Sequence, residues 1–119
     1  MDVKNFKKRL EDEIVLPLID LRNFDEDCGF CTRHVMTLRK HILKYLKKLS
    51  KLNSPTDDEI YKHMKKLIFA INKLNKKTDL CMLESEIGDD VCFFIEDVAF
   101  AAGLPETDED ITYDWRYEW

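Results

Sequence analysis

Hydrophobic side chains recur every three or four residues along most of the chain, a spacing typical of amphipathic helices. The first apolar stripe consists of Val3, Phe6, Leu10 and Ile14. Pro17 follows this stripe. Because proline lacks an N–H and its ring clashes with the preceding turn, we expect it to stop or kink the helix. The pattern therefore predicts a first helix over residues 3–16, followed by a loop.

The same spacing predicts three further helices, over residues 31–52, 57–76 and 80–102. Their apolar stripes are Leu38, Ile42, Tyr45, Leu46, Leu49 and Leu52, then Ile60, Met64, Leu67, Ile68, Ile71 and Leu74, and last Leu83, Ile87, Val91, Phe94, Ile95, Val98 and Ala102. Thr56 stands three residues before Glu59, the spacing of a capping box, in which each side chain bonds the other's free backbone N–H. This pair predicts where the third helix begins.

The fourth predicted helix has a signal at each end. Asp79 is a suitable N-cap, and Gly103 stands where a helix end favours a left-handed residue, with Pro105 just beyond it. Gly88 lies inside this helix and costs about 1 kcal/mol relative to alanine, so it is a point at which the helix can break.

Residues 104–119 form a tail, and its segment "ITYDWRYEW" alternates with period two. A lone strand would have no partner in this sequence, so we expect an irregular arm or a last helical turn. The sequence thus predicts an all-α fold. It is a single-domain bundle of four main helices, more than half helical, with an acidic-aromatic C-terminal arm.

The composition agrees with one folded domain over residues 1–119. Hydrophobic residues make up 45% of the chain and charged residues 36%, which is ordinary for a globular protein. No apolar run approaches the roughly 18 residues of a membrane span. The start, "MDVKNFKKRL", lacks the apolar segment of a signal peptide. We therefore expect a cytoplasmic protein without membrane association, whose four cysteines are thiols rather than disulfides.

The net charge of −5 conceals a strong asymmetry along the chain. Residues 33–77 carry 13 basic and 3 acidic side chains, whereas residues 78–119 carry 13 acidic side chains and one arginine. Two interpretations remain open. The two halves attract each other across the bundle, or the acidic end faces a basic partner.

Two cysteines have a spacing that suits metal binding. Cys28 and Cys31 form a C-x-x-C, and His34 lies one helical turn further, so the three could supply zinc ligands. Thioredoxin-type redox chemistry requires this motif at a strand-to-helix junction, and no strand is predicted before it. Cys81 and Cys92 do not have the spacing of a ligand pair. We therefore expect all four cysteines to be small buried hydrophobic side chains, and no metal to bind.

No motif indicates catalysis. With three glycines the chain has no glycine-rich phosphate loop, and it has no G-x-S-x-G. We expect a non-enzymatic protein with no cofactor and no small-molecule substrate. The lysine-rich second and third helices leave a nucleic-acid-associated regulator as an alternative, although the acidic C-terminal half would oppose a phosphate backbone.

The stretch "MLESEIGDDVCFFIEDVAFAAGLPETDEDITYDW" resembles the C-terminal half of a group of small, uncharacterised bacterial all-helical proteins. The shared features are an acidic turn, a helix with paired aromatics, an Ala-rich end closed by glycine, and a terminal acid-then-Trp segment. The segment "AINKLN" also has a counterpart, so the resemblance covers residues 60–116. It does not extend to the first 30 residues, and it contains no catalytic motif.

As a small, acidic chain without catalytic motifs, the protein is also similar in type to bacterial immunity proteins. These neutralise nuclease toxins, including those of contact-dependent growth inhibition. The resemblance implies a cognate toxin with a basic surface as partner, and a non-enzymatic helical adaptor module is the alternative. The expected partner-binding residues are Asp108, Glu109, Asp110, Tyr113, Asp114, Trp115, Tyr117 and Trp119 of the tail, and Glu84, Glu86, Asp89 and Asp90 of the fourth helix.

The aromatic residues of the tail have two possible roles. They fold back to cap the open end of the bundle, or they contact the partner. Both hold at once if Trp115 lies inside and Tyr117 and Trp119 lie outside.

Overall fold

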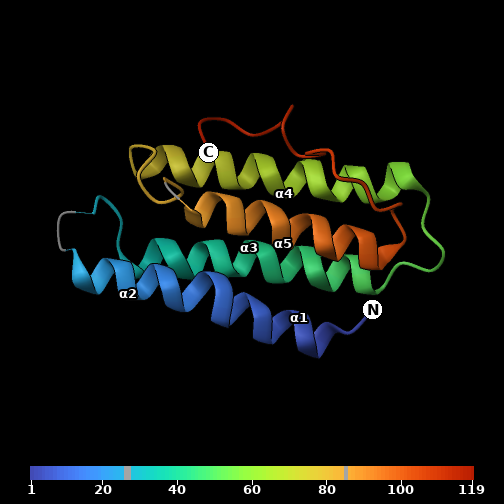
Figure 1. Ribbon diagram of the computed structural model, residues 1–119, viewed down its shortest axis with the longest axis horizontal. Helices are drawn as coiled ribbons and strands as arrows, with labels where there is room; N and C mark the ends of the chain where they lie inside the picture. The colour runs from blue at the N-terminus through green and yellow to red at the C-terminus, as the bar shows by residue number, and fades with distance from the viewer. Residues whose placement is uncertain (26–27, 85) are drawn as a thin grey trace.

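The protein is a bundle of four antiparallel helical rods that alternate in direction along the chain (Figure 1). The computed structural model describes residues 1–25, 28–84 and 86–119. The helices are α1 (Val3–Leu10), the π-helical segment η1 (Glu11–Val15), α2 (Leu16–Phe24), α3 (Thr32–Ser50), α4 (Asp57–Lys77) and α5 (Glu86–Ala102). These ranges contain no strand, and helices cover more than half of them. The predicted all-α bundle of four main helices is confirmed.

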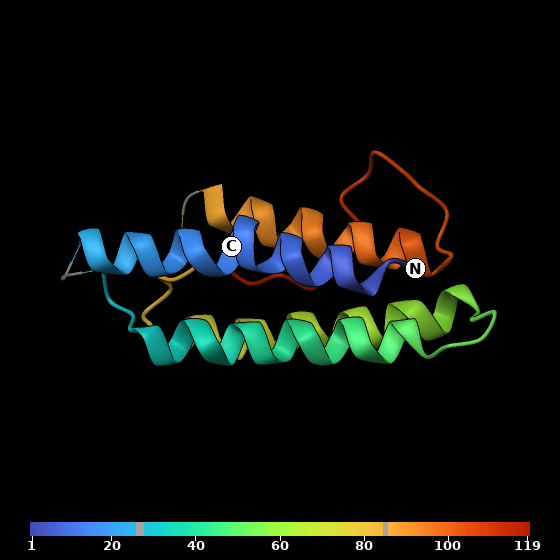
Figure 2. The same ribbon diagram turned by 90° about the horizontal axis from the view of Figure 1, so that it is seen from below.

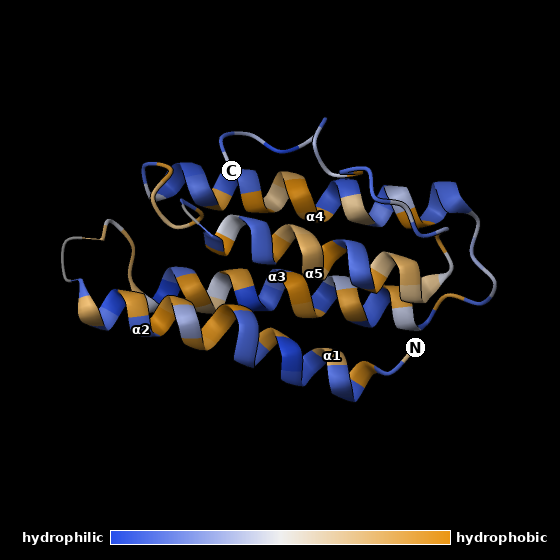
Figure 3. Ribbon diagram, viewed as in Figure 1, coloured by the Kyte–Doolittle hydropathy of each residue, from blue (hydrophilic) through white to orange (hydrophobic). Residues whose placement is uncertain are grey.

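The core lies between two layers of helices. One layer holds the rod formed by α1, η1 and α2 together with α5, and the other holds α3 and α4 (Figure 2). Each predicted stripe turns inward, and nearly all of its residues are buried or partly buried in one cluster (Figure 3). Phe6 of α1 meets Phe94 of α5 edge-on across this core. Within the described ranges no helix has the length and apolarity to cross a bilayer.

The first helical rod is longer than predicted. It does not end before Pro17 but continues to Phe24, through the π-helical turn η1. In this turn the Leu16 N–H bonds the Glu11 carbonyl, one residue further back than in an α-helix. Pro17 then stands in the first turn of α2, directly after the π-helical turn, and its missing N–H removes one bond of the continuous rod. The wide turn thus accommodates the proline without ending the rod.

Side-chain hydrogen bonds cap the N-termini of α3 and α4. The Thr56 hydroxyl accepts the Glu59 N–H at 3.2 Å and the Glu59 carboxylate accepts the Thr56 N–H at 3.3 Å, so the predicted capping box is confirmed. At the start of α3 the ring of His34 accepts the Cys31 N–H at 3.0 Å. This contact gives His34 a capping role.

The fourth predicted helix starts later than expected. Asp79 does not cap it, because Asp79 and Leu80 adopt left-handed backbone angles with φ of 55° and 65°, and α5 is helical from Glu86. The connecting turn is held by the end of α4. The Asn75 side chain accepts the Leu83 N–H at 3.2 Å.

At the other end, α5 closes as predicted. Gly103 has a φ of 126°, and its N–H bonds the carbonyl of Phe100. The N–H of Leu104 bonds the carbonyl of Ala99, which completes a Schellman motif. Leu104 is buried, so the motif directs the chain back toward the bundle.

Candidate functional site

The tail returns along the bundle, beside α4 (Figure 1). Asn72 of α4 holds it there with both ends of its amide. The Asn72 side chain donates to the Trp115 carbonyl at 2.7 Å and accepts the Tyr117 N–H at 3.0 Å. The indole N–H of Trp119 reaches the same oxygen. One polar side chain of a helix therefore fixes the last five residues of the chain.

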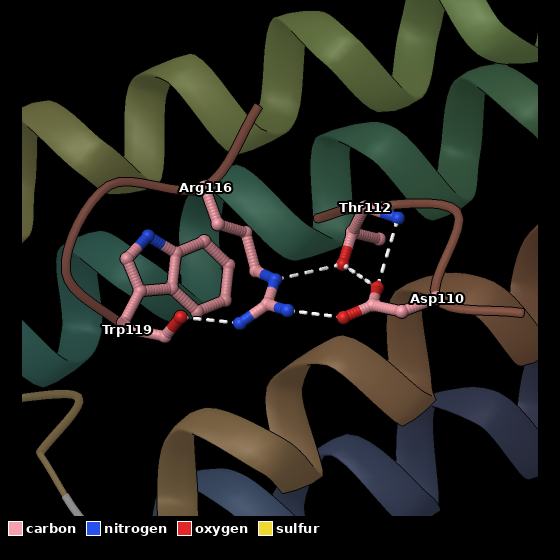
Figure 4. Close-up of polar contacts among 4 residues, drawn as sticks. All are labelled: Asp110, Thr112, Arg116 and Trp119. Atoms are coloured by element: carbon pink, nitrogen blue, oxygen red, sulfur yellow. Dashed lines mark hydrogen bonds and ion pairs between the residues drawn. The ribbon is translucent and has the colours of Figure 1, made fainter. Parts of the chain in front are cut away.

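Arg116 organises the tail from within (Figure 4). Its guanidinium donates to the Thr112 hydroxyl at 2.9 Å, and also to the Asp110 carboxylate and the Trp119 carbonyl. The Thr112 hydroxyl in turn donates to Asp110 at 2.7 Å, and Thr112 is fully buried. This network folds residues 110–119 into a compact turn rather than a strand.

The two tryptophans pack against the core, whereas the tail tyrosines face solvent. Trp115 meets Tyr61 of α4 edge-on, with ring centroids 6.0 Å apart, and Trp119 also contacts the core cluster. Tyr113 and Tyr117 are 71% and 51% exposed. Trp115 lies inside and Tyr117 outside, as the combined interpretation expects, but Trp119 does not lie outside. The indole is turned inward because Asn72 binds its N–H.

The tail and α5 together form an acidic hollow of about 150 Å³. Figure 2 shows a loop at the start of the tail, just after α5, standing out from the bundle on the side away from the α3–α4 layer. The carboxylates at the hollow are Asp89 and Glu96 of α5 and Asp108, Glu109 and Asp110 of the loop. Phe93 lies among them and is 62% exposed. The hollow therefore combines dense negative charge with one accessible aromatic ring.

The carboxylates of the hollow differ in their electrostatic state. Burial raises the pKa of Glu96, and the nearby charges of Asp110 and Asp97 raise it further. Burial also acts to raise the pKa of Asp110, but hydrogen bonds from Thr112 and the charge of Arg116 outweigh it and lower this pKa. The ionised carboxylate of Asp110 is thus paired with Arg116 within the chain. Asp108 and Glu109 are exposed and available to a partner.

The predicted binding residues do not form a single surface. Asp89, Asp108, Glu109 and Asp110 meet in the hollow. Tyr113 and Asp114 instead lie around Arg116 with Trp119. Asp90 does not line the hollow, and its pKa is raised first by burial and then by the charges of Glu13, Glu86 and Asp89. Glu84 is exposed in the turn before α5.

Four residues that line the hollow were not among the predicted binding residues: Cys92, Phe93 and Glu96 of α5, and Arg116 of the tail. The signal was available, because Asp89, Phe93 and Glu96 are spaced by four and three residues and so share one face of α5. Phe93 stands outside the predicted apolar stripe, whose nearest member is Phe94. Glu96 is nearly buried because the tail folds over it, which sequence spacing does not indicate.

The ion pairs of the described residues do not join the two charged halves. Between described residues, no lysine or arginine of residues 33–77 pairs with a carboxylate of residues 78–119. The ion pairs instead join Arg9 to Glu13 and Asp97, Arg39 to Glu11, and Arg116 to Asp110. Direct ion pairs between the two halves are therefore not among the contacts seen in the described part of the bundle.

The cysteines differ from the prediction. Only Cys92 is buried, and burial raises its pKa to about 11. Cys28, Cys31 and Cys81 are partly exposed, since they lie in the turns at one end of the bundle. A hydrogen bond from the His34 backbone lowers the pKa of Cys31. Among the described residues, no three His, Cys, Asp or Glu side chains are grouped so that they could hold a metal ion.

Compared with known proteins, the chain matches no family model, no curated protein and no solved structure. Its function is therefore inferred from its own surfaces.

Proposed function

We propose that the chain is a toxin-neutralising immunity protein. It would bind a cognate basic toxin domain of the nuclease type through the acidic hollow and cover that domain's active site. The observation that carries the proposal is the convergence of five carboxylates from α5 and the 108–110 loop around the exposed ring of Phe93.

The electrostatics of the hollow suit such a partner. A nuclease must bind phosphates, so its cleft is basic. Asp89, Asp108 and Glu109 are exposed, and their summed field would draw a basic surface from a distance. Charge of this kind acts mainly on the rate of association and on specificity.

Contact energy would come from exposed aromatic rings. Phe93 stands inside the hollow, and Tyr113 and Tyr117 are exposed on the tail. Binding energy at interfaces is concentrated in a few such side chains, surrounded by polar groups that exclude water. Trp115 and Trp119 contribute indirectly, since they fix the tail that presents the loop.

The experiment uses a basic toxin domain encoded beside the gene. Association and dissociation rates are measured at two salt concentrations, together with protection of cells that express the toxin. Asp108→Asn with Glu109→Gln should slow association about threefold to tenfold and flatten its salt dependence, because steering acts through screened charge. The matched control is Asp12→Asn with Asp20→Asn, two exposed carboxylates on the first rod.

Phe93→Ala tests the contact energy separately. It should speed dissociation at least tenfold while the helix content and melting temperature stay unchanged, because Phe93 is an exposed side chain. Full protection by a stably folded variant that carries all three substitutions would refute the acidic hollow as the interface. Tight binding to a basic protein without any protection would favour the adaptor module instead.

A further inference from the structure

A groove between α3 and α4 gathers positive charge. Lys44 and Lys48 of α3 and Lys66 of α4 stand around a cavity of about 160 Å³, together with His41 and His63. The two helices are antiparallel neighbours that form one layer of the bundle (Figure 2). The groove is separate from the acidic hollow and shares no residue with it.

The positive charge of this groove is not balanced by its own lining residues. No carboxylate lines it, and in the described part of the chain none of its three lysines belongs to an ion pair. Like charges on neighbouring helix faces repel each other, so this arrangement is unfavourable in the free protein. An anion in the groove would remove the repulsion.

The two histidines respond to the same field. Burial lowers the pKa of both rings, and the lysines around them lower it further. The charged groups that act on His41 are Lys44, Lys40 and Lys77, and those that act on His63 are Lys48, Lys62, Lys66 and, in the opposite direction, Glu59. An anion would reverse this effect, so binding and histidine protonation would support each other.

The floor of the groove is apolar. It is formed by the ring of Tyr45 with Leu67 and Ala70. The Tyr45 hydroxyl already donates to the Ile95 carbonyl at 2.9 Å inside the core, so this hydroxyl is not available to a ligand in the groove. A cavity of roughly 150 Å³ with apolar walls holds a benzene-sized molecule. The groove therefore has room for about one ring or a short alkyl chain.

We propose that this groove binds a small amphipathic organic anion, whose carboxylate or phosphate lies among Lys44, Lys48 and Lys66 and whose apolar part rests on Tyr45 and Leu67. The charge of the groove selects the anionic head and its floor selects the apolar body. Ammonium groups and protonated imidazoles donate charge-assisted hydrogen bonds to either type of head.

A nucleic acid would make different use of the same lysines. Phosphate backbones are bound by extended basic stripes, and the acidic tail loop would repel a long polyanion. Neither the apolar floor nor the partly buried histidines serve a phosphodiester backbone. The groove therefore favours a small ligand, and an oligonucleotide is included in the test as a competitor.

In the test, the full chain is titrated with benzoate and with phenyl phosphate, and binding is measured by calorimetry and by changes in amide chemical shifts. Saturable binding should perturb residues 41–48 and 63–70. Benzyl alcohol, which lacks the charge, and inorganic phosphate, which lacks the ring, should each bind at least about tenfold more weakly. The tighter of the two anions identifies the preferred head. Benzoate binding should tighten as the pH falls from 7.5 toward 5, because the bound anion favours protonation of the two histidines, whose pKa values are lowered in the free protein.

Lys44→Gln with Lys66→Gln should weaken binding of the anions about tenfold or more, because charge-assisted hydrogen bonds are lost. Lys7→Gln with Lys8→Gln on α1 makes the same change of net charge away from the groove and should leave the affinity unchanged. Melting curves establish that both variants are folded. Equal affinity for benzyl alcohol and benzoate, or equal affinity in the two double variants, would overturn the proposal. So would binding of an oligonucleotide with no response to either small anion at millimolar concentration.

Discussion

Two polar side chains, Asn72 and Arg116, decide the path of the C-terminal tail. Asn72 bonds three groups of residues 115–119, and Arg116 bonds three groups within residues 110–119. Hydrogen bonds of this kind contribute about 1 kcal/mol each, but an unmade bond at a partly buried group costs more. The tail is therefore sensitive to single substitutions at these two positions.

We expect Asn72→Ala to release the end of the tail without unfolding the bundle. Three tail groups lose their partner, so the free energy of unfolding should fall by about 1 to 3 kcal/mol. Both tryptophans of the chain lie in the tail, so their fluorescence should shift to longer wavelength while the helical circular dichroism stays unchanged. Lys62→Ala, an exposed change on the same helix, is the control. An unchanged emission spectrum would show that Asn72 does not hold the tail.

Glu96 should make a pH-dependent contribution to stability. Burial raises its pKa above the unfolded value, so the folded state takes up a proton at higher pH than the unfolded chain. The ionised side chain thus destabilises the fold at pH 7, and this cost disappears as the pH falls through the folded pKa. Glu96→Gln should raise the melting temperature at pH 7, and the gain should shrink toward pH 4. Glu106→Gln, at an exposed position, should show neither effect. A lower melting temperature for Glu96→Gln at pH 7 would contradict this account.

At the scale of elements, helix boundaries depend on contacts that lie outside the helix. The start of α5 is an example, because the turn before it is bonded to Asn75 and the Leu83 carbonyl lies against the first turn of the helix. A β-carbon on Gly88 would stand 2.6 Å from that carbonyl oxygen. Gly88 is therefore required by close approach of the backbone rather than by a break in the helix.

Gly88→Ala distinguishes this explanation from helix propensity. Propensity alone predicts that alanine stabilises the helix by about 1 kcal/mol. The contact with the Leu83 carbonyl instead predicts a loss of about 1 to 3 kcal/mol in the free energy of unfolding, because backbone must move to admit the methyl group. Chemical denaturation measures the difference, and Ala101→Gly in the exposed last turn reports the propensity term alone. Stabilisation by Gly88→Ala would contradict this explanation, because it would show that the turn can move the Leu83 carbonyl away at little cost.

The helices and their buried faces could be predicted because both follow from the spacing of apolar residues within each segment. The capping box of Thr56 and the end at Gly103 could also be predicted, since their partners lie within a few residues. The passage of the first rod through Pro17, the late start of α5 and the inward turn of Trp119 could not. Each depends on a π-helical turn or on a partner distant in sequence, such as Asn72.

The candidate site could also be predicted only in part, because the charge of each segment is visible in the sequence but the contacts between distant segments are not. The acidic character of the tail and of α5 is visible in the composition, and four of the twelve expected residues do meet in the hollow. Their convergence depends on how the chain folds back after Leu104, which no local pattern specifies. Asp110 was expected to bind a partner, but its carboxylate accepts a hydrogen bond from Arg116 within the tail. The sequence did not indicate this pairing.

At the scale of the whole molecule, the basic segment 33–77 and the acidic segment 78–119 form two separate charged surfaces. Lysines gather over α3 and α4, and carboxylates gather over α5 and the tail loop. Since no ion pair between described residues joins residues 33–77 to residues 78–119, each surface retains its own repulsion. Such segregation costs some stability, and it leaves both surfaces free to attract ligands of opposite charge.

The cost of this segregation can be measured at Lys44, which stands in the middle of α3 between Lys40 and Lys48. Lys44→Glu replaces two repulsive spacings of four residues by attractive ones, each worth about 0.2 to 0.5 kcal/mol on a helix surface. The free energy of unfolding should therefore rise at low salt, and the gain should fade above about 0.3 M salt because the charges are exposed and screened. Lys44→Gln should gain less, since it only removes repulsion. Lys44→Glu would also abolish the proposed anion site. A variant that is more stable but no longer binds benzoate would show that the lysine cluster lowers the stability of the protein. A loss of stability in Lys44→Glu at low salt would instead show that the lysines of α3 do not repel one another appreciably.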